Sequence, residues 1–132
     1  MPIRSNTFLR YVLLADGLAS GATGLLMIAG AGPLEGLLGL PSALTREAGL
    51  LLVPYVAFVA FLGTREMISR TAVQTAIAIN VAWAVASIGL LLMDYVAPTA
   101  LGYAFVVSQA AVVVVFAELQ SIGLRRTEMA IA

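Results

Sequence analysis

Four apolar stretches, each about long enough to cross a lipid bilayer as a helix, occupy most of this 132-residue chain. They cover about residues 8–29, 45–62, 71–93 and 98–122. Charged residues make up only 11% of the chain, against about 25% in a typical soluble domain. So few charges cannot cover a globular surface in water. The sequence therefore predicts an all-α, polytopic membrane protein, in which a single domain of four transmembrane helices forms a bundle.

The segments that connect these stretches predict how the helices are joined. Residues 33–47 are too apolar for a solvated loop, so we expect a short interfacial helix or a shallow re-entrant segment there. Residues 63–71 form a short polar connection, and Pro98 is well placed as the first residue of the last helix. The tail beyond residue 122 is expected to be short and frayed.

Two ten-residue segments predict an internal duplication. GLLMIAGAGP, at residues 24–33, matches GLLLMDYVAP, at residues 89–98. Both segments end a predicted helix that starts on the same side of the membrane, so the repeat would be parallel rather than inverted. The second helical hairpin would then be a copy of the first.

The distribution of arginine predicts the orientation of the chain in the membrane. All seven basic residues are arginine. One predicted side carries six of them, and only Arg46 falls on the other side. The six are Arg4, Arg10, Arg65, Arg70, Arg125 and Arg126. By the positive-inside rule both termini lie in the cytoplasm, and we expect a multi-pass protein of the cell inner membrane.

Asp16 is set inside the first apolar stretch, where a carboxylate costs a few kcal/mol on membrane-insertion scales. Ser20 and Thr23 continue its helical face at i+4 and i+7. One interpretation is a proton- or cation-linked site. A second is an interhelical hydrogen bond, for instance to Asn80, which lies at a similar depth in the third stretch. A third is an ion pair with an arginine near the interface.

Small and polar residues on two of the helices predict how these helices pack. Gly17, Gly21 and Gly24 share one face of the first helix and allow another helix to approach closely. This pattern fits packing within the chain as well as dimerisation. Asn80 and Trp83 share a face of the third helix. We favour a polar contact between helices for Asn80 and a packing role for Trp83.

Composition excludes several classes of function. The chain has no cysteine and no histidine, which excludes disulfides, thiol chemistry and histidine-based catalysis. Its formal net charge is zero, which argues against nucleic acid as a partner. No nucleotide-binding loop, metal-ligand cluster or catalytic triad is recognisable in the sequence. We therefore expect no cofactor, no metal and no enzymatic activity.

Several segments resemble those of small uncharacterised four-helix integral membrane proteins of bacteria. They are LLADGLASGATGLL, GPLEGLLGLP, the proline-containing second stretch and the ending FAELQSIGLRR. This resemblance covers most of the chain and implies no activity. The chain is also similar in size and helix number to the small multidrug resistance exporters, where Asp16 would take the place of their usual glutamate. It lacks their surrounding motifs, and its long segment at residues 33–47 departs from them.

Two hypotheses for the function follow from these observations. The first is a non-enzymatic accessory or structural subunit of a larger membrane assembly, in contact with membrane lipids and with other integral membrane proteins or itself. The alternative is a proton-coupled transporter of a small hydrophobic or cationic molecule, acting as a homodimer through Asp16. Fold-level similarity alone does not decide between them.

Overall fold

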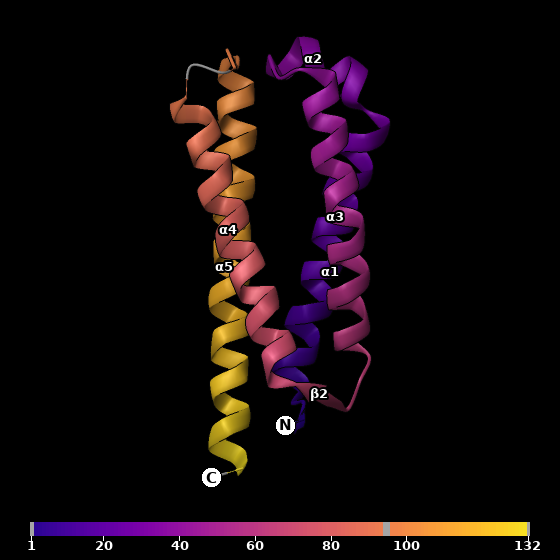
Figure 1. Ribbon diagram of the computed structural model, residues 1–132, viewed down its shortest axis with the longest axis vertical. Helices are drawn as coiled ribbons and strands as arrows, with labels where there is room; N and C mark the ends of the chain where they lie inside the picture. The colour runs from indigo at the N-terminus through magenta and orange to yellow at the C-terminus, as the bar shows by residue number, and fades with distance from the viewer. Residues whose placement is uncertain (1, 94–95, 132) are drawn as a thin grey trace.

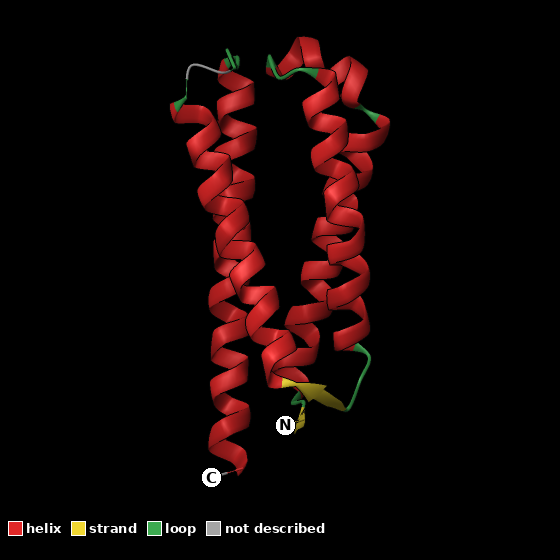
Figure 2. Cartoon of the chain, in the orientation of Figure 1, coloured by secondary structure: helices red, strands yellow, loops and turns green. Residues whose placement is uncertain are grey.

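The structure, a computed structural model, describes residues 2–93 and 96–131; Asp94 and Tyr95, which we expected in a turn, lie outside the described residues. This part of the chain contains five helices and two short strands (Figures 1 and 2). In chain order they are β1 (Pro2–Arg4), α1 (Thr7–Ala29), α2 (Ala31–Leu38), α3 (Ser42–Gly63), β2 (Met67–Ser69), α4 (Arg70–Leu92) and α5 (Ala100–Ile131). Four helices are long and apolar enough to cross a membrane. The predicted all-α class is confirmed, and the chain is a multi-pass membrane protein.

The four long helices are arranged as two antiparallel pairs. α1 packs against α3, and α4 packs against α5. Figure 1 shows the pairs close together near the strands and further apart toward α2. α1 and α5 provide most of the contact between the pairs. Each pair therefore joins two consecutive membrane helices, while the duplication of one pair from the other stays a prediction.

A two-stranded sheet joins the two pairs at the end that carries the N-terminus. β1 and β2 pair antiparallel, with Ile3 opposite Ile68. Both side chains are buried in an apolar cluster with Leu9, Leu13 and Val73. The connection at residues 63–71, expected to be a plain polar loop, thus contains a strand. A three-residue strand with one inward side chain is too short to give a readable alternating pattern.

The opposite end of the molecule has a second junction between the pairs. α2 lies in the segment for which we expected a short helix, and it ends at Gly39, whose φ of 70° is left-handed. Leu38 packs against Val106 of α5. The Thr99 backbone N–H donates to the Leu38 carbonyl at 3.0 Å, and the Thr99 hydroxyl donates to the Leu37 carbonyl at 2.6 Å. The pairs are therefore tied at both ends.

The start of α5 differs from the expected one. The Gly102 N–H donates to the Thr99 hydroxyl at 3.1 Å, so Thr99 caps the helix. Pro98 consequently precedes the cap instead of opening the helix. α3, in contrast, begins at Ser42, three residues before the expected start at residue 45.

The expectation of a frayed tail is wrong, because α5 continues through it to Ile131. Leu124 and Thr127 are buried on this extension. The Asn6 side chain caps α1 by accepting from the Leu9 N–H at 2.7 Å, and its Nδ2 donates to the Thr127 hydroxyl at 2.6 Å. Packing against the start of α1 therefore holds α5 as far as Thr127, which sequence polarity alone does not predict.

Candidate functional site

Asp16 lies nine residues beyond the start of α1, or about 14 Å along the helix axis. Tyr55 lies eight residues before the end of α3, and Asn80 lies ten residues after the start of α4. Because α3 runs opposite to α1 and α4, these positions stand at nearly the same height above the sheet. Gln120 of α5 meets them there. One polar side chain from each long helix thus converges on a single level of the membrane domain.

The carboxyl group of Asp16 accepts four hydrogen bonds at this level. Its Oδ1 accepts from the Ser20 hydroxyl at 2.9 Å. Its Oδ2 accepts from the Tyr55 hydroxyl at 2.5 Å, Gln120 Nε2 at 2.7 Å and Asn80 Nδ2 at 3.1 Å. Asn80 Nδ2 also approaches Gln120 Oε1 at 3.3 Å. We call these five residues the Asp16 clamp.

All five residues of the Asp16 clamp are buried. Asp16 and Gln120 have no exposed surface, and Asn80 is 3% exposed. The Asp16 carboxyl group accepts three of its hydrogen bonds at Oδ2 and one at Oδ1, and no buried side-chain polar atom of the described residues lacks a partner. All four donors to the carboxyl group are neutral side chains. The structure therefore shows interhelical hydrogen bonds at Asp16, and not the ion pair with an arginine that was the third interpretation. The clamp links all four long helices through one side chain.

The structure brings the predicted residues Asp16, Ser20 and Asn80 together. The predicted site did not include Tyr55 or Gln120. A signal for Gln120 does exist: it follows Gln109 by eleven residues, about three helical turns, so the two lie on the same face. Gln109 also lies toward the interior of the protein and is partly buried. No comparable spacing marks Tyr55.

A second polar network lies above the clamp, within the α4–α5 pair. Trp83 Nε1 donates to Gln109 Oε1 at 2.7 Å. Gln109 Nε2 in turn donates to the Ser87 hydroxyl at 2.9 Å and to the Val106 carbonyl at 3.0 Å. Trp83, for which we favoured a packing role, is thus oriented by a specific hydrogen bond.

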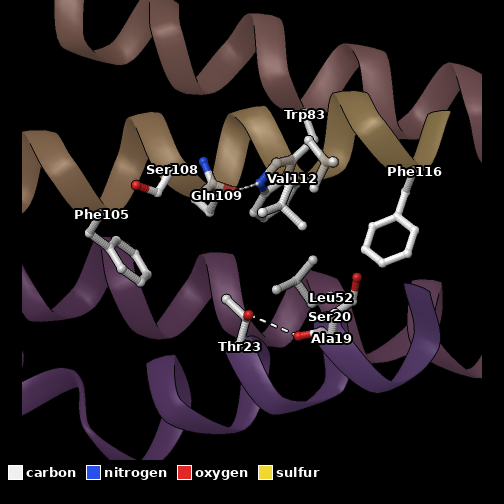
Figure 3. Close-up of a pocket in the computed structure, with 11 residues that line it drawn as sticks. Ala19, Ser20, Thr23, Leu52, Trp83, Phe105, Ser108, Gln109, Val112 and Phe116 are labelled. Carbon is white, nitrogen blue, oxygen red and sulfur yellow. Dashed lines mark hydrogen bonds between the residues drawn. The ribbon is translucent and has the colours of Figure 1, made fainter. Parts of the chain in front are cut away.

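A cavity of about 240 Å³ lies between the two pairs, next to this second network. Figure 3 shows side chains of α5 and Trp83 of α4 facing side chains of α1 and α3 across it. Phe105 and Phe116 line it with Trp83, and Ser20 of the clamp lines it from α1. Ser20 therefore belongs both to the clamp and to the cavity wall.

The glycine face of α1 is directed at α3. A Cβ on Gly17 would meet Val59, one on Gly21 would meet Val56, and one on Gly24 would lie 3.3 Å from the Leu52 Cβ. The structure thus places Gly17, Gly21 and Gly24 at a contact within the chain.

Comparison with known proteins adds no further assignment. No protein-family model, no curated protein and no solved structure matches the chain. Within the described residues, no group of three or more acidic, histidine or cysteine side chains is placed to hold a metal ion.

Proposed function

We propose that the chain is a non-enzymatic accessory subunit of a larger membrane assembly. The observation that carries this proposal is an uncovered stripe of small residues along α4. Ala78, Ala82 and Ala86 are exposed at four-residue spacing, and Gly89 continues the stripe. A Cβ on Gly89 would meet nothing within 4 Å. Small residues at this spacing let a second membrane helix approach closely.

The low burial of α4 by the rest of the chain supports the same proposal. Only 17% of its apolar span is buried, against 39% for α1. Its buried residues are Val73, Ala76, Asn80 and Ala84, and none of them lies in the last two turns of the helix. In the complex, a helix of the partner protein would cover the opposite, small-residue face. The burial of Asp16 fits a non-enzymatic role, because its carboxyl group has no exposed surface that a substrate could contact.

Stoichiometric co-purification after mild extraction of the C-terminally tagged chain from native membranes tests the subunit role. We expect a fixed ratio to one or more larger membrane proteins. Ala82→Leu should reduce the bound partner at least about tenfold, because one lost close helix packing contact of about 1.4 kcal/mol has that effect. Ala22→Leu, an exposed change on α1, should leave the ratio unchanged. Recovery of the chain alone, or equal ratios for both variants, contradicts the proposal.

The alternative, a proton-coupled transporter acting as a homodimer, is favoured by one feature. Ser20 connects the Asp16 carboxyl group directly to the cavity wall. In this case the purified chain would run alone as a dimer. Asp16→Asn would abolish pH-dependent transport in proteoliposomes, and unchanged transport would remove the alternative.

We further propose that both termini face the cytoplasm of a cell with an inner membrane. All described arginines except Arg46 lie at the sheet end of the molecule, where Arg10 Nε donates to the Gly63 carbonyl at 3.3 Å and Arg126 lies over the Phe8 ring. A fluorescent protein fused at the C-terminus should therefore fold and fluoresce, since the reporter folds only in the cytoplasm. Alkaline phosphatase inserted after Gly36, in α2, should be active on the other side. The reverse pattern contradicts this orientation.

A further inference from the structure

We propose that the cavity between the two helix pairs binds a small, uncharged aromatic molecule of one or two rings that carries a hydrogen-bond donor, such as a phenol. The ligand enters from the bilayer and lies between the second polar network and the Asp16 clamp. This inference goes beyond the subunit role and does not depend on it.

The size of the cavity sets the size of the ligand. Its volume is about 240 Å³. An apolar cavity of about 150 Å³ in a soluble protein stays dry and binds benzene. The present cavity therefore has room for one or two rings, and is smaller than a typical site for a drug-sized ligand, which starts at about 300 Å³.

The lining of the cavity favours an uncharged aromatic ligand. Trp83, Phe105 and Phe116 contribute three rings, against which a planar molecule packs favourably. None of the described residues that line the cavity is charged. Asp16 is close by, but its side chain has no exposed surface. A cation would enter this apolar space without a direct counter-charge, at high desolvation cost.

The polar atoms on the α1 side of the cavity favour a ligand with a donor. The Ser20 hydroxyl donates its hydrogen to Asp16, and the Thr23 hydroxyl donates to the Ala19 carbonyl at 2.8 Å. Both oxygens therefore present only lone pairs to the cavity, and Figure 3 shows them on the side of α1 that faces α5. Because the Ser20 hydroxyl donates to the Asp16 carboxyl group, its oxygen is a stronger acceptor. A lipid acyl chain cannot use these acceptors.

Trp83 provides a direct test, because it is the single tryptophan of the chain and lines the cavity. The purified full-length protein in detergent is titrated with 4-bromophenol or with bromobenzene, and contact quenching of Trp83 fluorescence is recorded. We expect saturable quenching by both probes. The affinity for 4-bromophenol should be about fivefold higher, as expected for one additional neutral hydrogen bond.

Three variants give the controls. Ala19→Phe fills the cavity and should remove the saturable quenching, whereas Ala22→Phe, at an exposed position of the same helix, should not. Ser20→Ala removes one of the two acceptors, so it should lower the affinity for 4-bromophenol toward that for bromobenzene and leave bromobenzene unaffected.

Two results would overturn the proposal. Quenching that rises linearly with probe and is the same in Ala19→Phe means that acyl chains or detergent fill the space. Equal affinity for the two probes, insensitive to Ser20→Ala, means that the cavity does not select a donor. Both results are distinct from failure of co-purification, which tests the subunit role.

Discussion

Replacing Asp16 with leucine is expected to destabilise the packed helices by about 2–4 kcal/mol while making α1 easier to insert into the membrane. The change removes the acceptor of four hydrogen bonds at once. Tyr55 loses its partner in a buried site, and the two amide side chains keep only their contact with each other. Unsatisfied buried donors cost about 1–3 kcal/mol each, but single interhelical bonds in membranes average about 0.6 kcal/mol, which limits the total.

Asp16→Leu is expected to favour membrane insertion and to weaken helix packing, so the two effects can be measured separately. Removing a carboxylate from the middle of a membrane helix favours insertion by about 2.5–3.5 kcal/mol. The variant should therefore reach the membrane at normal or higher levels and still unfold earlier in a detergent-denaturant titration. Tyr55→Phe serves as the matched control: it removes one donor, keeps the ring, and should cost no more than about 1 kcal/mol. An Asp16→Leu protein as stable as the parent would show that the clamp contributes nothing to packing.

The sequence predicts the number of helices and the presence of an interior carboxylate for simple physical reasons. Helix length and apolarity are local properties that the bilayer imposes on each segment separately. A buried Asp16 requires hydrogen-bond donors. Asn80 was identifiable as one because the first and third helices start on the same side of the membrane, so the depth of each residue can be counted from its helix start. Tyr55 and Gln120 depend on how the pairs are rotated against each other. That rotation is set by side-chain packing between helices. It cannot be predicted from a sequence that is apolar on every face of its helices, because no face is marked as the interior one.

The elements that sequence reasoning missed have a common cause. β1 and β2, the extension of α5 and the cap at Thr99 are each stabilised by residues distant in the chain. Secondary-structure propensity depends on residues close in the sequence, so it cannot predict contacts between distant ones. The cavity likewise depends on how the two pairs are arranged, since residues of all four long helices line it.

Replacing Gly102 with alanine is expected to open the junction between the pairs at the α2 end, at a cost of about 1–3 kcal/mol. An added Cβ would overlap the Leu38 carbonyl oxygen and lie 2.9 Å from the Pro98 Cβ. Leu38 cannot move away freely, because its carbonyl also accepts the Thr99 N–H. Spin labels on Glu35→Cys and Tyr103→Cys, both exposed positions in a chain without cysteine, measure the separation of the junction.

The distance between the labels should become longer or more broadly distributed in Gly102→Ala. Gly89→Ala is the matched control, because its Cβ would lie in open space and alanine is the better helix former by about 1 kcal/mol; it should leave the distribution unchanged. An unchanged distribution in Gly102→Ala would mean that the Leu38 segment adapts at little cost. If the junction opens while the Asp16 clamp keeps its stability, the two pairs hinge at the clamp, and the width of the cavity is set by the α2 junction alone.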